Sequence, residues 1–168
     1  MTDLIIGIDP GATGALGVIG VDGKVRGVSR LPVQTRDYGK GRELNVPEIL
    51  EAMRSWSKEG IVVGVALERV NAMPAKGRNV GTTSMFHFGE NVGMLRALCA
   101  GCFPRAPMHR PMPMTWKKSF GLVGKSKEAS VSCARRLFPD IAPSFTKKVD
   151  EGLAEALLIA EWLRRELK

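Results

Sequence analysis

The chain has 168 residues, of which 44% are hydrophobic, so we expect a single folded domain over residues 1–168 rather than a disordered chain. No apolar run approaches the ~18 residues that cross a bilayer, and the amino terminus lacks the basic segment of a secretory signal. We therefore expect a cytoplasmic protein with no membrane partner. Lys and Arg number 25 against 17 Asp and Glu, and the resulting net charge of +8 favours a nucleic-acid partner.

The first half of the chain predicts four strands and one helix. "LIIGIDPG" at 4–11 is a buried strand that ends in turn residues. "GALGVIGVDGKVRGVSRLP" at 14–32 predicts two strands with a hairpin turn at Asp22-Gly23. Residues 47–58 have helical periodicity, and "IVVGVALE" at 61–68 predicts another strand buried on both faces.

The second half is predicted to be mostly helical. Residues 69–83 are basic, rich in Gly and Pro and without periodicity, so we expect a mobile loop there. The elements expected after it are a helix at 85–99, a short strand within 107–112 and helices at 125–138 and 149–163. In the helix at 85–99, the side chains expected in the core are Met85, Phe88, Val92, Leu95 and Cys99. The order of elements predicts an α/β fold with a mixed sheet flanked by helices.

The three cysteines do not predict a zinc site. Cys99 and Cys102 have the C-x-x-C spacing, but a structural zinc ion takes four ligands. The remaining candidates, Cys133, His87 and His109, do not form a second pair at ligand spacing. We expect the cysteines to be small buried residues near helix ends.

Two acids stand at the ends of predicted strands. Asp9 ends the first strand, and Glu68 ends the strand at 61–68. Because the ends of neighbouring strands meet at one edge of an open α/β sheet, we expect these carboxylates to lie close together.

Two further acids open the last helix. Glu151 and Glu155 are four residues apart, so they share a face with their Cβ atoms about 5–6 Å apart. Like charges at this spacing repel, and a divalent cation is the simplest compensation, with oxygen ligands favouring Mg²⁺ or Mn²⁺. Taken singly, each of the four acids has an ordinary explanation as a turn, surface or helix-dipole residue. Their expected convergence in a basic chain favours a site.

Asp150 is adjacent to Glu151 but has a different predicted role. It lies about 100° of helical rotation from Glu151 and so cannot share its face. We expect Asp150 to be the N-cap, accepting a hydrogen bond from a free backbone N–H of the first turn. The metal-binding role is therefore assigned to Glu151.

Motifs along nearly the whole chain resemble those of the RuvC-like Holliday junction resolvases of the ribonuclease H superfamily, especially the branch found in phages and organelles. The matching segments are "GIDPGATGALGVI" (7–19), "ALERV" (66–70), "SMFHFGENVGML" (84–95), "MTWKKSFGL" (114–122), "LFPD" (137–140) and "KKVDEGLAEALLIAEWL" (147–163). The resemblance implies a ribonuclease H-like fold with a five-stranded mixed sheet. It also implies an endonuclease that resolves four-way DNA junctions by two-metal-ion hydrolysis, for recombination and repair.

The resemblance places the acidic tetrad of this family, catalytic and metal-binding, on Asp9, Glu68, Glu151 and Glu155. The implied cofactor is Mg²⁺, with Mn²⁺ as a substitute, and no small-molecule cofactor is expected. The family usually has Asp where this chain has Glu151 and Glu155. Glu reaches one methylene further and can still bind a metal ion.

The resemblance also implies a homodimer that makes paired symmetric nicks in a branched DNA. Gly89 and Gly93 would let a second helix approach closely, whether from a partner subunit or from the protein's own fold. The basic residues expected to bind DNA are Lys76, Arg78, Lys117, Lys118, Lys125, Lys127, Lys147 and Lys148. Phe86 and Phe88 are candidates for stacking on bases, although Phe88 fits the core spacing better.

The resemblance leaves three alternatives to consider. An actin-like kinase or ATPase fold also begins with an Asp and a Gly-rich turn, but it needs a second such loop and a second domain, which 168 residues cannot hold. A nuclease of the same fold could act on other branched or RNA–DNA hybrid substrates. A protein that binds junctions without cleaving them is the third alternative.

Overall fold

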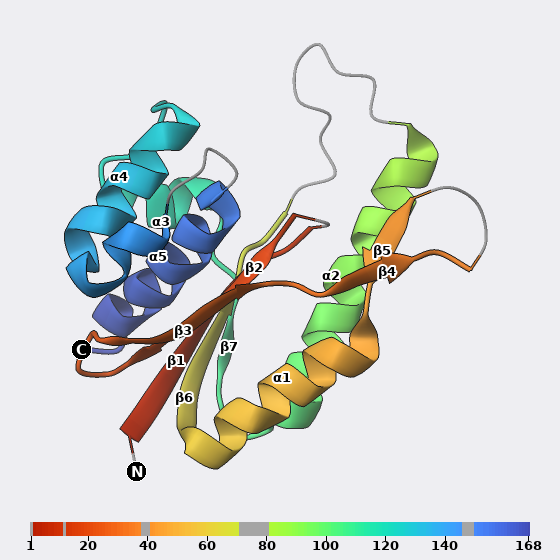
Figure 1. Ribbon diagram of the computed structural model, residues 1–168, viewed down its shortest axis with the longest axis horizontal. Coiled ribbons are helices and arrows are strands. Elements are labelled where there is room, and N and C mark those ends of the chain that lie inside the picture. Colours follow the sequence, from red (N-terminus) through yellow and green to blue (C-terminus); the bar gives the residue numbers. More distant parts are fainter. Residues whose placement is uncertain (1, 12, 38–40, 71–80, 146–149) are drawn as a thin grey trace.

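The computed structural model describes residues 2–11, 13–37, 41–70, 81–145 and 150–168, and its centre is a five-stranded mixed sheet. The strand order is β3-β2-β1-β6-β7 (Figure 1). The strands are β1 (Thr2–Asp9), β2 (Ala15–Gly20), β3 (Val25–Arg30), β6 (Gly60–Leu67) and β7 (Met108–His109). β1 pairs antiparallel with β2 and parallel with β6. The predicted mixed sheet is confirmed.

Helices cover both faces of this sheet (Figure 1). On one face, α1 (Val46–Glu59) and α2 (Thr82–Cys102) contribute Ile49, Met53, Leu95 and Cys99 to a core shared with the sheet. The elements on the other face are α3 (Pro113–Ser119), α4 (Lys127–Leu137), the 3₁₀ helix η1 (Pro139–Ser144) and α5 (Glu151–Glu166). The fold is therefore a sheet between two helical layers.

Alternation along β1 decides which side chain meets which layer. Ile6 and Ile8 pack toward α1 and α2, whereas Ile5 packs toward α5. Since successive side chains of a strand point to opposite faces, Gly7 and Asp9 share the α5 face with Ile5. The last residue of β1 is thus directed toward the helix that carries the other predicted acids.

Helix α5 lies directly on the sheet because glycine occupies the crossing points. A Cβ at Gly7 would overlap the backbone of α5, at Ala156 O and Ala160 N. A Cβ at Gly17 of β2 would be 2.9 Å from the backbone nitrogen of Leu157. Any side chain at either position would push α5 away from the strands, so these glycines fix the height of α5 above the sheet.

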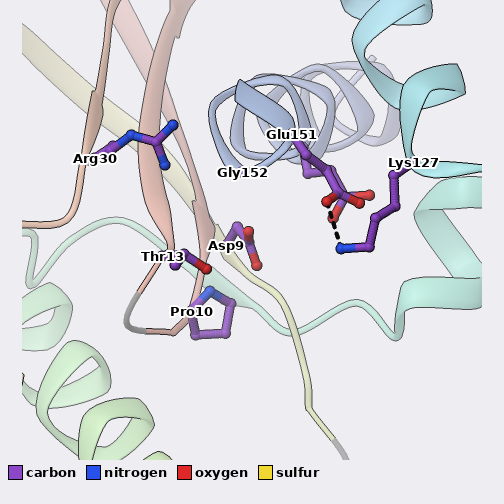
Figure 2. A pocket seen from close by; sticks show the side chains of 8 residues that line it. Asp9, Pro10, Thr13, Arg30, Lys127, Glu151 and Gly152 are labelled. Atoms are coloured by element: carbon purple, nitrogen blue, oxygen red, sulfur yellow. Dashed lines mark hydrogen bonds and ion pairs between the residues drawn. The ribbon is translucent and has the colours of Figure 1, made fainter. Parts of the chain in front are cut away.

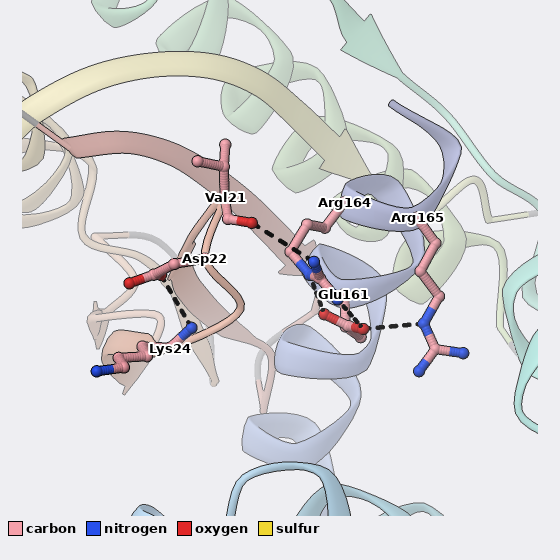
Figure 3. Close-up of polar contacts among 6 residues, drawn as sticks. All are labelled: Val21, Asp22, Lys24, Glu161, Arg164 and Arg165. Carbon is pink, nitrogen blue, oxygen red and sulfur yellow. Dashed lines mark hydrogen bonds and ion pairs between the residues drawn. The ribbon is translucent and has the colours of Figure 1, made fainter. Parts of the chain in front are cut away.

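The carboxyl end of α5 is held by an ion-pair network around Glu161 (Figure 3). Glu161 is 4% exposed and accepts hydrogen bonds from Arg164 Nε at 2.7 Å and Arg165 Nε at 2.8 Å. Arg164 also donates to Val21 O at 3.4 Å, which links the helix to the β2–β3 turn. Burial alone would raise the pKa of Glu161, but the two arginines outweigh burial and hold that pKa below its usual value.

Several predicted elements need correction. α2 begins at Thr82, inside the segment predicted as a mobile loop; residues 71–80 of that segment lie outside the described residues. The buried residues of α2 are Asn91, Leu95 and Cys99, whereas Met85 is exposed and Phe88 and Val92 are half-buried. The amino-terminal turns of α2 extend beyond the sheet, so their apolar residues have no core to join (Figure 1).

Other differences concern short or peripheral elements. Ile61 of β6 is 57% exposed, so this strand is buried on both faces only in its second half. The hairpin of β4 (Val33–Thr35) and β5 (Arg42–Leu44) was not predicted, because three-residue strands are too short to give a periodic signal.

The three cysteines are free, with Cys99 and Cys133 buried. No helix within the described ranges is both long and apolar enough to span a membrane.

Replacing Gly7 by Ala is expected to lower the free energy of unfolding by about 3 kcal/mol or more, because the methyl group overlaps the backbone of α5. The matched control is Gly101→Ala in α2, where a Cβ meets no atom within 4 Å and stability should be unchanged or slightly higher. Urea denaturation of both variants measures the difference. Equal stabilities would contradict the close docking of α5.

Replacing Glu161 by Gln is expected to cost on the order of 1.5–3 kcal/mol at neutral pH, since the three hydrogen bonds from Arg164 and Arg165 lose their anionic acceptor. The folded state lowers the pKa of Glu161 below 4.5, so its contribution is present above that value and disappears as the pH falls through the lowered pKa. Thermal melts of wild type and variant should therefore converge in acid. A stability difference that persists unchanged at low pH would contradict this origin.

Candidate active site

The candidate site lies where β1 and β6 end and α5 begins. Asp9 is the last residue of β1, and Glu68 follows the last residue of β6. Figure 2 shows Asp9 directed toward the start of α5, across a cleft of about 480 Å³. The residues that line this cleft are Asp9, Pro10, Thr13, Arg30, Lys127, Glu151, Gly152 and Glu155.

Gly152 lets the first turn of α5 come close to the β1–β2 connection. A Cβ at this position would be 2.7 Å from Thr13 O and 3.4 Å from Asp9 Oδ2. Glu151 and Glu155 lie on the same side of this turn, as their spacing predicts, and both line the cleft. The acids of the helix are thereby brought to the acid of the strand.

Bringing these acids together raises the pKa of two of them. Burial, followed by repulsion from Glu68, Glu155 and Glu151, raises the pKa of Asp9 to about 8. Burial also raises the pKa of Glu68, and the hydrogen bond from Trp116 opposes that rise only in part. The structure therefore brings all four predicted acids into one electrostatic cluster, in which Asp9 is the most strongly perturbed.

Each of the other three acids is held by a polar partner. Glu68 accepts a hydrogen bond from the buried Trp116 Nε1 at 2.7 Å. Glu155 Oε1 accepts one from Ser130 Oγ at 3.0 Å and pairs with Lys117 Nζ at 2.8 Å. Glu151 pairs with Lys127 Nζ at 2.7 Å. These contacts orient the carboxylates and place two ammonium groups beside them.

The chemistry of this cluster fits a hard divalent cation. All of its donors are carboxylate oxygens, and a cation would relieve the repulsion that raises the pKa of Asp9. Within the described residues, no three acidic, His or Cys side chains are already arranged as ligands of one ion. Binding would therefore require the carboxylates to exchange part of their contact with Lys117 and Lys127 for the ion.

The predicted capping hydrogen bond of Asp150 is not formed. It occupies the N-cap position of α5, but its side chain makes no capping hydrogen bond. Its backbone (φ −82°, ψ 7°) is not in the extended region usual for an N-cap, so the carboxylate is directed elsewhere. It is buried and lies 3.4 Å from Arg30 Nη2. Glu151, rather than Asp150, lines the cleft.

The fold and part of the sequence match proteins of known structure or function. The structure of T. thermophilus RuvC in complex with a Holliday junction substrate superposes with a TM-score of 0.64 at 20% identity, over 97% of this chain and 95% of that one. A second Thermus thermophilus RuvC structure gives a TM-score of 0.51 at 19% identity, over 97% and 96%. This chain has a RuvC-like fold.

Sequence comparison adds a distant relative to the RuvC-like fold. The chloroplastic Holliday junction resolvase MOC1 of Chlamydomonas reinhardtii is 36% identical over 91 residues, which are 54% of this chain. They are 10% of that protein, so the match spans about a tenth of the relative's length. No family model matches the chain. The chain is a distant homologue of this resolvase with a RuvC-like, ribonuclease H-like α/β fold, as the motifs predicted.

The predicted DNA-binding residues of the RuvC-like chain fall into three groups. Lys117 and Lys127 pair with acids of the cleft. Lys118 and Lys125 are exposed. The remaining four, Lys76, Arg78, Lys147 and Lys148, lie outside the described residues. Of the two candidate stacking residues, Phe86 is 64% exposed, while Phe88 is half-buried beside Gly11.

Three residues of the site were not singled out by the sequence. Trp116 entered the sequence analysis only within the matching segment "MTWKKSFGL", although a lone Trp between polar residues often needs a partner for its N–H. Ser130 and Arg30 carried no signal, because neither is near an acid in the sequence. Their contacts with Glu155 and Asp150 span 25 and 120 residues and depend on the tertiary fold.

Proposed function

We propose that this chain is a structure-selective DNA endonuclease that resolves four-way junctions by metal-dependent phosphodiester hydrolysis. The observation that carries the proposal is the gathering of Asp9, Glu68, Glu151 and Glu155 at one edge of the sheet, where the pKa of Asp9 rises to about 8. The distant homology to a junction resolvase supports a four-way junction as the substrate. It also supports a relationship with the organellar branch of these enzymes.

The four carboxylates would hold Mg²⁺, with Mn²⁺ as a substitute. Divalent ions bound there would supply an activated water and would stabilise the leaving oxygen. Asp9 is the central ligand candidate, because the other three acids all raise its pKa or lie beside it in the cleft. Trp116 and Ser130 orient Glu68 and Glu155 through their hydrogen bonds.

Lys117 and Lys127 give the cleft its affinity for a phosphate. Their ammonium groups lie 2.8 Å and 2.7 Å from carboxylates of the site, so a strand that reaches the acids also reaches them. Cations held by the carboxylates would free these lysines to contact the phosphodiester. The Lys117 ammonium also lies 5.0 Å from the centroid of the Trp116 ring, which limits its range of positions.

The same two ion pairs favour a second candidate function, a junction-binding protein that does not cleave. Lysines that neutralise Glu155 and Glu151 supply internally the charge compensation that a metal ion would give. Cleavage of other branched or RNA–DNA hybrid substrates by the same site is the remaining variant. Incubation of the protein with a four-way junction, a duplex and a hybrid in Mg²⁺, Mn²⁺ and EDTA separates these functions.

We predict that the junction is cut in Mg²⁺ or Mn²⁺ and not in EDTA, and that Asp9→Asn and Glu151→Gln each lower the rate at least 100-fold. Asp150→Asn should retain measurable activity, because Asp150 does not line the cleft. Asp140→Asn, which neutralises an exposed acid in η1, is the matched control and should cut like wild type.

Three results would contradict the proposal. Undiminished cleavage in EDTA would exclude a metal-dependent site. An active Glu151→Gln beside an inactive, folded Asp150→Asn would exchange the roles of these two acids. Tight junction binding with no cleavage in either metal would establish the non-cleaving alternative.

The proposed enzyme acts as a homodimer, in which two copies of the site cut symmetric strands of the junction. A Cβ at Gly89, Gly93 or Gly101 of α2 would meet no atom within 4 Å, so these glycines are not used for packing within the described chain. Gly89 and Gly93, four residues apart, share one exposed helical face. A second copy of α2 is the partner that this face would fit.

A leucine at Gly93 is expected to weaken self-association at least tenfold while leaving the fold intact, because the side chain points away from the protein's own core. Sedimentation equilibrium measures the change. Ser55→Leu, on the exposed side of α1, adds the same bulk away from α2 and should associate like wild type. A Gly93→Leu protein that dimerises as well as wild type would place the interface elsewhere.

A further inference from the structure

Three arginines gather beside the candidate active site, where β6 and β7 end. Arg69 immediately follows Glu68, and Arg110 immediately follows the last residue of β7. The backbone N–H of Arg69 donates to Pro111 O at 2.8 Å, so the two segments stay side by side beyond the strands. Arg96 belongs to α2 and is adjacent to the buried Leu95.

The alternation of the strands puts these arginines on the α2 side of the sheet. Ala66 packs toward α5 and Leu67 toward α2, so continued alternation directs Glu68 to the acid cluster and Arg69 to the opposite face. In β7, Met108 packs toward α2, and Arg110, two residues later, shares that face. The three side chains therefore form a cluster separate from the acids, and the two groups meet at the adjacent residues Glu68 and Arg69.

This arginine cluster (Arg69, Arg96 and Arg110) has no acidic partner. None of the three forms an ion pair or a side-chain hydrogen bond with any residue in the described ranges. The sequence positions outside those ranges contain no Asp or Glu, so they cannot supply a side-chain carboxylate either. The cluster carries three positive charges that the side chains of the chain do not compensate.

Arg110 is the member of the cluster whose guanidinium is most strongly affected by burial and by its neighbours. Its Nε is buried and has no hydrogen-bond partner among the residues that the structure describes. Burial, followed by repulsion from Arg96 and Arg69, lowers the pKa of its guanidinium below the usual value. Arg69 and Arg96 are exposed, which leaves the cluster accessible from solvent. An anion with several oxygens would satisfy the unpaired donors and relieve the repulsion.

We propose that Arg69, Arg96 and Arg110 bind a second backbone phosphate of the DNA, on the α2 side of the sheet and apart from the scissile phosphate. The assignment rests on the proposed function for its ligand, since the strand that enters the acid cleft passes the end of β6. A phosphodiester offers two free oxygens to the planar guanidinium groups. Such a contact positions the DNA and adds affinity without reading sequence.

The test is the salt dependence of binding to a fluorescent four-way junction in EDTA, where no cleavage occurs. We expect Arg96→Gln to lower the slope of log affinity against log salt by a fraction of a unit, and the double variant Arg69→Gln/Arg96→Gln to lower it by about one unit, because the cluster neutralises one phosphate. Affinity near 100 mM salt should fall several-fold per arginine. Arg96→Lys keeps the charge and should recover most of the slope.

Lys24→Gln is the matched control, because it removes one exposed positive charge from the β2–β3 turn at the other end of the sheet. It should bind like wild type. Thermal melts establish that each variant is folded; Arg69 and Arg96 are exposed, so their replacement should leave stability intact.

The outcomes separate this inference from the proposed function. Wild-type binding with an unchanged slope in the double variant overturns the arginine site alone. Loss of self-association in the arginine variants, with DNA affinity per dimer unchanged, overturns it in favour of a subunit contact. A wild-type protein that binds no junction overturns both proposals.

Discussion

The close contact between α5 and the sheet is the constraint on which the site depends. Gly7 and Gly17 leave no side chain between β1, β2 and the helix backbone, and Gly152 brings the first helical turn against the β1–β2 connection. With a larger residue at any of these crossings, Glu151 and Glu155 would move away from Asp9. The position of the acids is thus set by residues that have no side chains of their own.

The close contact between α5 and the sheet also destabilises the protein when no ligand is bound, because it holds four acids together. Four carboxylates are gathered in a partly buried cluster, and the pKa of Asp9 rises to about 8 as a result. The chain offsets part of this cost with Trp116, Ser130 and two lysines. On the other face, Arg69, Arg96 and Arg110, which form no ion pair within the described part of the chain, present the opposite charge. Like charges are therefore placed close together on both faces of the sheet at this edge, which destabilises the free protein. Such an arrangement is expected where a charged ligand binds.

The sequence predicted the parts of the site that depend on local spacing. Asp9 and Glu68 follow from the ends of strands, and the shared face of Glu151 and Glu155 follows from their separation of four residues. It did not predict Trp116, Ser130 or the arginine cluster, since these contacts join segments distant in the chain. Asp150 was misjudged because a sequence position next to a helix does not determine the backbone angles on which capping depends. Leu95 and Cys99 of α2 were predicted correctly as core residues, but Met85 was not, because periodicity identifies a helix but not where the sheet beneath it ends.

The most direct test of the central claim, that these carboxylates form a divalent-cation site, is anomalous diffraction from crystals grown with Mn²⁺. The account predicts at least one anomalous peak within ligand distance of Asp9, between the end of β1 and the first turn of α5, with Glu155 or Glu68 as a second ligand. Crystals with well-ordered carboxylates, saturating Mn²⁺ and no peak at this position would contradict it. In that case the acids would remain paired with Lys117 and Lys127, and the site could not hydrolyse DNA by the proposed route.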